Sequence, residues 1–295
     1  PVYKNDLMLK LSYDFGDGNY LEFKAGKTDL DGDVSYIGLT KADFDADPYQ
    51  RYAGTIHDNM DSDQTRYYLR YLKEINESTT LTTTFFSNEF NRDWYKISKV
   101  DGNSIGEGAL GTANNVAILK GDANGEIIYK HNDRSYETKG FQANLDFEVG
   151  NNNFELGFRY TDDHYSYNPG YTEDNYTMST TSGLMLVNST GQNPGNKVTN
   201  RDSKALEVYL IDEISLGALT LTPGIRYTNV DYEYNLGETS ISDTLLGIAG
   251  SYDLGSNLIF AGVHEGHSLP GPTSSLQEET SLGFELGIRS KGDSP

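Results

Sequence analysis

Apolar and polar residues alternate strictly in several segments of this chain. From Phe141 to Val149 every odd position carries an apolar side chain and every even position a polar or charged one. Similar alternation recurs from Phe154 to Tyr160 and from Leu219 to Tyr227. A period of two places successive side chains on opposite faces of a β-strand, so each segment has one apolar and one polar face. The sequence therefore predicts an all-β chain.

The connections between the predicted strands are alternately short and long. Tight turns such as 16–19, 76–78 and 150–153 alternate with long polar stretches such as 91–135 and 167–203. Loops beyond about 12–15 residues are uncommon in compact soluble domains, whereas outer-membrane barrels combine short periplasmic turns with long extracellular loops. This spacing favours an antiparallel transmembrane β-barrel, with a soluble solenoid, sandwich or propeller as the alternative. The eleven predicted strands are 6–15, 20–28, 64–75, 79–90, 137–149, 154–166, 205–215, 219–234, 243–253, 257–265 and 281–290.

The alternation also predicts which side chains share a face. Arg70, Arg159 and Arg226, together with Arg289, fall on the polar face, which would line the interior of a barrel. The apolar face would contact lipid. Its predicted members include Leu7, Leu9, Leu11, Phe141, Leu145, Phe147, Phe154, Leu156, Phe158, Leu221, Ile225, Leu282, Phe284 and Leu286.

Composition excludes several other classes of protein. The mean hydropathy is −0.59, and no run of about 18–20 apolar residues is available for a transmembrane helix. The net charge of −21 argues against nucleic acid as a partner, because phosphate binding requires a basic surface. The absence of cysteine excludes disulfides and any cysteine metal site.

The number of predicted strands indicates a fragment. Single-chain bacterial barrels have an even number of strands, whereas eleven are predicted here and the chain ends lie close to strands on both sides. The segment 101–126 is rich in glycine and asparagine, so we expect it to be mobile and without a specified conformation.

Several segments resemble TonB-dependent outer-membrane receptors. Asn5–Lys10 and, most specifically, Gly38–Asp47 resemble the ferric citrate transporter group within them, whereas Leu210–Tyr227 and Glu278–Arg289 resemble the superfamily as a whole. The resemblance implies a 22-stranded barrel in the bacterial outer membrane, in contact with its lipid and filled by an N-terminal plug that engages TonB. Residues 1–295 would then form part of the barrel domain, with the plug and the C-terminal strands missing.

The resemblance further implies a receptor that captures a ferric siderophore, with ferric citrate as the favoured cargo. Arginine suits such anions, because its planar fork makes bidentate bonds to carboxylates. Arg92 and Arg134 match ligand-binding arginines of the family by position, and Arg201 lies near a third. The alternative for each is an ion pair with an adjacent acid, which would be Asp93, Asp133 or Asp202.

Other functions have weaker support in the sequence. Another siderophore or an oligosaccharide remains an alternative cargo, and an outer-membrane enzyme remains an alternative class, although no catalytic motif is present. We expect no cofactor, because iron would arrive inside its chelate. We also expect no metal site, because the five histidines are scattered and the neighbouring pair, His264 and His267, would lie on opposite faces of a strand. Asp29, Asp31 and Asp33 superficially resemble a calcium loop, but the glycine falls at the wrong position.

Overall fold

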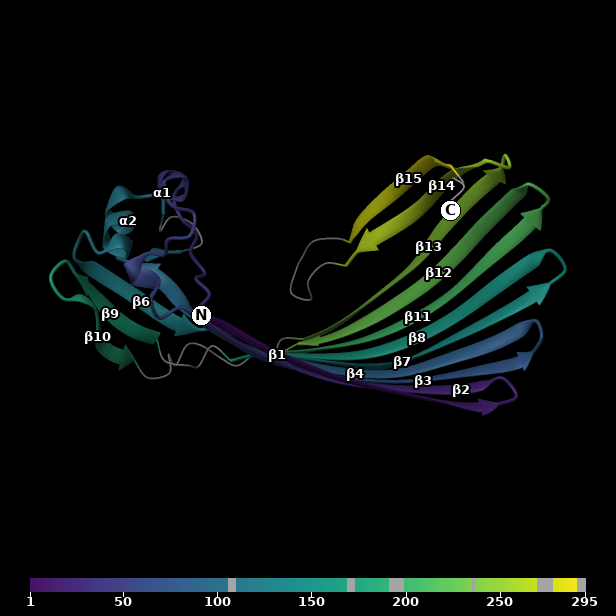
Figure 1. The fold of residues 1–295 in the computed structure, drawn as a ribbon, viewed down its shortest axis with the longest axis horizontal. Coiled ribbons are helices and arrows are strands. Elements are labelled where there is room, and N and C mark those ends of the chain that lie inside the picture. The colour runs from purple at the N-terminus through teal and green to yellow at the C-terminus, as the bar shows by residue number, and fades with distance from the viewer. Residues whose placement is uncertain (106–109, 169–172, 191–198, 235–236, 270–277, 291–295) are drawn as a thin grey trace.

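Eleven long antiparallel strands form one curved sheet, shown in Figure 1. The computed structural model describes residues 1–105, 110–168, 173–190, 199–234, 237–269 and 278–290. All eleven predicted strands are confirmed, and no helix in the described part of the chain is long and apolar enough to cross a membrane. In sheet order the strands are β1 (Val2–Gly16), β2 (Asn19–Gly32), β3 (Asn59–Asn76), β4 (Thr79–Val100), β7 (Asp133–Val149), β8 (Asn152–Asn168), β11 (Thr199–Leu216), β12 (Leu219–Tyr234), β13 (Gly237–Asp253), β14 (Asn257–Ser268) and β15 (Glu279–Ser290).

The pairing register gathers the apolar positions of the strands on one face. Leu145 lies opposite Leu81 on β4 and opposite Leu156 on β8. Leu210 on β11 and Ile225 on β12 continue the same row. Because side chains alternate along a strand, this register places all fourteen predicted apolar residues on one face, which we call the apolar face, and the four predicted arginines on the other, which we call the polar face. Both predictions of face are confirmed.

Glycines opposite aromatic rings fix this register on the polar face. The ring of Tyr209 covers Gly157 so closely that a Cβ at that glycine would lie 2.1 Å from the ring. Phe260 covers Gly287 in the same way, with a separation of 2.2 Å. Covering a strand glycine with a cross-strand aromatic ring is a known way of fixing strand register. If the register shifted, a residue with a side chain would replace the glycine and would collide with the ring.

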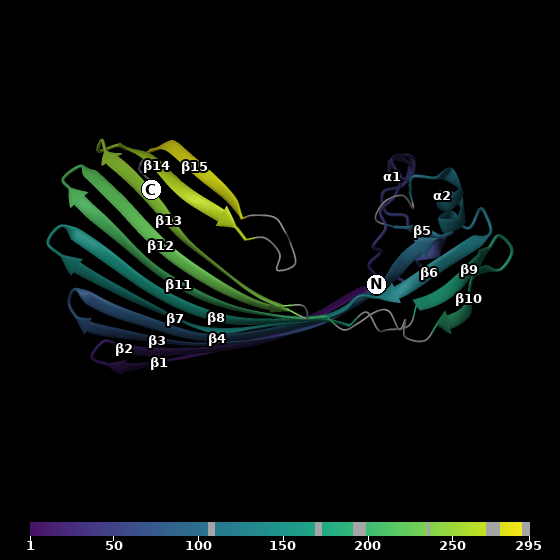
Figure 2. The same cartoon turned by 180° about the vertical axis from the view of Figure 1, so that it is seen from behind.

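The short turns gather at one end of the sheet, as Figures 1 and 2 show together. In the turn between β1 and β2, Gly18 has a φ of +69°, and a Cβ there would meet the Cβ of Glu74 at 2.4 Å. Only glycine adopts this backbone without strain in so confined a place. The other end of the sheet carries the long connections.

Three long connections pack together into a small domain of their own at that end (Figure 2), which we call the loop domain. Its core consists of side chains that are at most 4% exposed: Tyr52, Ile97, Val100, Ile118, Leu119, Ile127, Tyr129 and Met178. Its elements are α1 (Lys41–Ala46), the 3₁₀ helix η1 (Ala53–Thr55), β5 (Asn103–Ser104), α2 (Ala113–Lys120), β6 (Gly125–His131), β9 (Glu173–Ser179) and β10 (Gly183–Thr190).

The expectation that residues 101–126 lack a specified conformation is therefore wrong for the described part of this segment. Ile118 and Leu119 of α2 are fully buried in the loop-domain core, and Gly121 ends the helix with a φ of +88°. Burial of apolar side chains supplies the free energy that orders the segment. Residues 106–109 lie outside the described residues.

One hairpin joins the barrel wall to the loop domain without a change of register. Arg92 on β4 lies opposite Arg134 on β7, and Tyr95 farther along β4 lies opposite His131 on β6. The predicted end of the fourth strand near Phe90 is therefore wrong, because β4 continues to Val100. β4 itself is continuous at this point. Only its partner changes, from β7 in the barrel wall to β6 in the loop domain.

Asp43 links the two helices of the loop domain. Its Oδ2 accepts hydrogen bonds from the Thr40 hydroxyl at 2.6 Å and the Tyr52 hydroxyl at 2.7 Å, and its Oδ1 lies 2.5 Å from the Lys120 Nζ of α2. The hydrogen bond from Lys120, with those from Thr40 and Tyr52, lowers the pKa of Asp43 to about 2. Within the segment Gly38–Asp47, Asp43 therefore connects α1 to Tyr52 and to α2.

Replacing Asp43 by asparagine should loosen the loop domain in a pH-dependent manner. The folded pKa of Asp43 is lowered from 3.8 to about 2, so its stabilising effect is fully present above 3.8 and is lost as the pH falls through about 2. We expect amide hydrogen exchange in α1 and α2 to be faster in Asp43→Asn than in wild type at neutral pH, and this difference to shrink as the pH falls from 3.8 through about 2. Asp45→Asn is the matched control, because Asp45 forms an ion pair with the exposed Lys41 of its own helix and not with α2. Equal effects of the two substitutions would contradict the prediction.

Candidate anion-binding site

Four cationic side chains face one another where the polar face passes into the loop domain. Arg92 lies opposite Arg134, and Lys96 lies opposite Lys130. Arg92 and Lys96 are four residues apart on β4, so both project from the same face of the strand. The backbone amide of Asn132 donates to the carbonyl of Trp94 and closes the gap between the two pairs. We call Arg92, Lys96, Lys130 and Arg134 the cationic ladder.

The ladder carries charge that the described residues do not neutralise. Like charges directly opposite each other destabilise a sheet, and none of the four side chains forms an ion pair with another residue in the described ranges. Lys96 is only 6% exposed. An anion bound among these four side chains would reduce the repulsion and replace the missing carboxylate partners.

Lys96 lies against two aromatic rings. Its Nζ lies 3.1 Å from the centre of the Tyr36 ring and 5.1 Å from the centre of the Trp94 ring. These cation–π contacts favour the charged lysine, but burial and the positive charges of Lys130, Arg92 and Arg134 act against it and lower the pKa of Lys96 to about 8. Since this pKa is above neutral pH, Lys96 is predominantly charged at pH 7.

The third predicted arginine, Arg201, shares an aromatic neighbour with the ladder. Arg134 and Arg201 both lie against Tyr165, with guanidinium carbons 6.0 and 5.6 Å from the ring centre. Arg134 also lies 5.1 Å from the ring centre of Tyr167. Arg201 is on β11, two strands away from Arg134, so Tyr165 of β8 bridges the distance between them. The structure thus brings Arg92, Arg134 and Arg201 to one face.

The alternative of local ion pairs is not what the structure shows for two of these arginines. The carboxylate of Asp93 contacts the His131 ring, and that of Asp202 lies 2.6 Å from Nδ1 of His164. Each of these aspartates directly follows an arginine in its strand, so its side chain projects from the opposite face. Arg134 donates from Nε to the Asn132 side chain at 3.0 Å.

Sequence reasoning missed the two lysines. Lys96 continues the alternation that begins at Arg92, and this signal was hidden because the strand was expected to end at Phe90. Lys130 lies in the long polar connection 91–135, where no strand was predicted, and its pairing with Lys96 becomes visible only from the register of β6.

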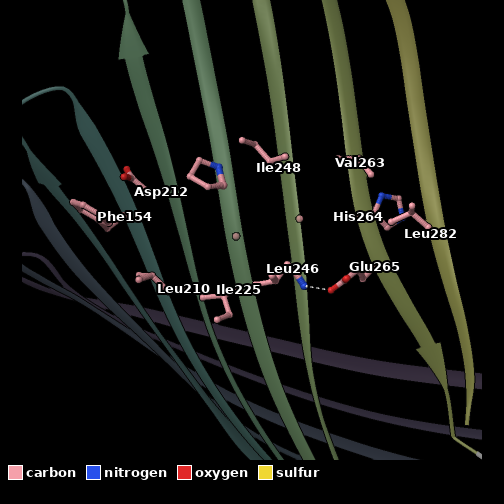
Figure 3. A pocket seen from close by; sticks show the side chains of 13 residues that line it. Phe154, Leu210, Asp212, Ile225, Leu246, Ile248, Val263, His264, Glu265 and Leu282 are labelled. Carbon is pink, nitrogen blue, oxygen red and sulfur yellow. Dashed lines mark hydrogen bonds between the residues drawn. The ribbon is translucent and has the colours of Figure 1, made fainter.

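A separate hollow lies away from the ladder, and Figure 3 shows its lining. It has a volume of about 580 Å³ and is bordered mainly by apolar side chains of β8 and β11–β15, including Leu210, Ile225 and Ile248. These side chains belong to the apolar face. The hollow is therefore part of the surface that a barrel presents to lipid.

Comparisons with known proteins give the same picture of the fold. The sequence profile of the family described as "TonB dependent receptor-like, beta-barrel" matches residues 2–294. No protein with curated annotation matches the sequence.

Three solved structures illustrate the similarity. The ferric citrate transporter FecA in its unliganded form is 22% identical with a TM-score of 0.67, over 99% of this chain and 41% of that chain. The ferric-catecholate import receptor Fiu from E. coli K12 in its closed form is 14% identical with a TM-score of 0.70, over 98% of this chain and 49% of that one. The siderophore receptor PiuA from Acinetobacter baumannii is 12% identical with a TM-score of 0.69, over 97% and 47%. The chain therefore spans less than half the length of each of these three proteins.

Trp94 offers a direct test of the ladder's charge. It is the only tryptophan of the chain, and it lies between the two cationic pairs. At pH 7 we expect the fluorescence of Trp94, isolated as wild type minus Trp94→Phe, to be quenched more strongly by iodide than by neutral acrylamide, relative to free tryptophan. Anions concentrate where positive potential is high.

The charge contribution can be assigned with single substitutions. Arg134→Gln should lower the iodide quenching constant about twofold, since a charge roughly 8 Å away in water contributes about 0.5 kcal/mol. Arg226→Gln is the control, because that arginine pairs with Glu207 at 2.7 Å. Quenching by iodide that is no stronger than by acrylamide would show that the ladder attracts no anion.

Proposed function

Since the chain belongs to the TonB-dependent receptor β-barrel family, we propose that its parent protein captures an anionic ferric siderophore, with ferric citrate as the favoured cargo. Barrels of this family are outer-membrane proteins in bacteria, and the structural neighbours are transporters or receptors. The parent would be a transporter without catalytic residues. The chain covers 41% of the ferric citrate transporter. We therefore also propose, for the parent protein, that uptake is coupled to TonB through a plug domain.

The observation that carries the proposal is the cationic ladder. Four cations face one another on the polar face without a carboxylate partner among the described residues. Ferric citrate complexes are anionic and rich in carboxylate oxygens. Arg92 and Arg134 would each offer a planar fork to a carboxylate, whereas Lys96 and Lys130 would act as point charges. Arg201 would contact the same ligand from the far side of Tyr165.

In this proposal the iron is bound by the siderophore and not by side chains of the receptor. A chelated ferric ion already has its coordination positions occupied by the chelator, so the receptor needs groups that recognise carboxylates and charge. The described residues of the ladder are all hydrogen-bond donors, which are complementary to carboxylate oxygens. The chain itself then requires no cofactor.

One observation favours a second cargo. Tyr165 and Tyr167 lie against Arg134, and Trp94 lies between the cationic pairs. Aromatic rings next to cations also suit a siderophore whose iron-binding groups are themselves aromatic, because rings stack on rings and on guanidinium groups. A ferric catecholate is therefore the alternative cargo, and an affinity comparison between the two chelates distinguishes them.

Arg92→Ala or Arg134→Ala should weaken ferric citrate binding by the parent receptor. Each removes a charge-assisted hydrogen bond to a ligand carboxylate, which contributes about 1.5–3 kcal/mol, or roughly a ten- to hundredfold loss of affinity. Arginine-to-lysine substitutions should restore part of it, since the charge remains while the fork is lost. The measurement is equilibrium binding of ferric citrate to outer-membrane vesicles that contain the full-length receptor.

Arg159→Ala is the matched control. Arg159 lies on the same polar face, with its guanidinium carbon 5.3 Å from the Phe86 ring centre, but outside the ladder. We expect its substitution to change the affinity far less. Unchanged affinity in both ladder variants would remove Arg92 and Arg134 from the site, and tighter binding of a ferric catecholate by the wild type would replace ferric citrate as the cargo.

A further inference from the structure

The backbone pairing between β13 and β14 stops before the strands end. Hydrogen-bonded pairing runs from Asp253–Leu258 to Gly247–His264 and goes no farther in the described residues. Beyond this point side chains connect the two strands. The carboxylate of Glu265 accepts from the Leu246 amide at 2.9 Å, as the dashed line in Figure 3 marks. The outer ends of β13 and β14 are therefore joined by side chains and not by a sheet ladder.

A cluster of metal-ligand side chains lies at this opening. Nδ1 of His267 on β14 is 2.8 Å from Oδ2 of Asp243 on β13. On the next strand, Thr280 lies opposite His267, and Glu278 is the residue directly before that strand. One ligand atom from each of Asp243, His267 and Glu278 lies within 4.8 Å of the other two.

We propose that Asp243, His267 and Glu278 bind one divalent transition-metal ion of the zinc class. One imidazole nitrogen and two carboxylate oxygens form a three-ligand set that zinc accepts, with water in the fourth position. Bond lengths of about 2.0–2.1 Å in a tetrahedral site place ligand atoms roughly 3.3 Å apart. Small side-chain movements convert the present separations, 2.8 Å for the first pair and within 4.8 Å overall, into that geometry.

Two other histidine–aspartate pairs show what distinguishes this one. His131 contacts Asp93, and His164 lies 2.6 Å from Asp202. Within the described ranges only the His267 pair has a third ligand close enough for metal coordination. A histidine–aspartate pair alone is an ordinary hydrogen bond, whereas the added carboxylate of Glu278 supplies the charge and the third donor that a divalent cation requires.

Metal binding here would act as a staple. The three ligands come from β13, β14 and the residue before β15, so one ion would connect three successive strands where the β13–β14 ladder has ended. Because a bound ion stabilises only the conformation that positions its ligands, it would hold the outer ends of these strands together. The site lies away from the cationic ladder of β4, β6 and β7, and the inference is independent of the proposed cargo.

The expectation of no metal site arose because sequence spacing gave no sign of this cluster. Asp243 and Glu278 lie 24 residues before and 11 residues after His267, and two hairpins bring them together. His264, the nearer histidine in the sequence, projects from the other face of β14 and does not belong to the cluster.

The test is zinc binding by the full-length receptor in detergent after treatment with a chelator. Zn²⁺ is titrated in competition with a chromophoric chelator, in the absence of any siderophore. We expect His267→Ala to lower the affinity of one Zn²⁺ equivalent at least tenfold, since loss of even a supporting residue costs 10–100-fold. His164→Ala breaks a histidine–aspartate pair that has no third ligand among the described residues, and it should leave the titration unchanged.

Two nearly isosteric variants guard against misfolding. Asp243→Asn and Glu278→Gln preserve side-chain size and should each weaken the same equivalent. Co²⁺ added to the wild type should give visible absorption from low-coordinate cobalt, and this absorption should be lost in His267→Ala but kept in His164→Ala. The proposal is overturned if the wild type binds no Zn²⁺ equivalent that the three site variants weaken, or if His164→Ala weakens it as much as His267→Ala.

Discussion

Backbone hydrogen bonding is the constraint on which this structure depends. A chain that spans a lipid phase must satisfy its peptide groups internally, because lipid offers no hydrogen-bond partner. Here the nine strands between β1 and β15 each pair with a neighbour on both sides, while β1 and β15 pair on one side among the described residues. The side-chain period of two then assigns each strand residue to a face. A slip of one residue would move Leu145 and Leu156 to the polar face. The rings of Tyr209 and Phe260 oppose such a slip, because each occupies the space beside a glycine on the next strand.

The sheet could be predicted from sequence because its signal is local. Alternation within about ten residues identifies a strand, and the length of a connection separates one end of the sheet from the other. The loop domain has no such local signal. Ile118 and Ile127 lie in one connection and Met178 in another, separated by polar and glycine-rich residues, and they become part of a core only when the connections meet. The end of β4 was misplaced for the same reason, because its partner beyond Tyr95 comes from the loop domain.

The candidate site combines both kinds of information. Sequence resemblance selected Arg92, Arg134 and Arg201 individually, but their common face follows from register. Lys96 and Lys130 lie on the same face because β4 continues beyond Arg92 and pairs with β6 in the register that it has with β7. Positive charges that would be solvated if they lay on separate loops are instead close together on one face of paired strands. A rigid ladder holds these groups at fixed separations before any ligand arrives, which reduces the entropy that binding must overcome.

The shared core of the loop domain also bears on how such surfaces can change by recombination. Segments that project independently from a barrel can be exchanged singly between related genes, because each carries its own contacts. In this chain Tyr52, Ile118 and Met178 come from three different connections and pack against one another. A transplanted connection would arrive without its partners and leave a cavity. Successful chimeras should therefore inherit all three connections together, so the domain, and not the single loop, is the unit of diversification.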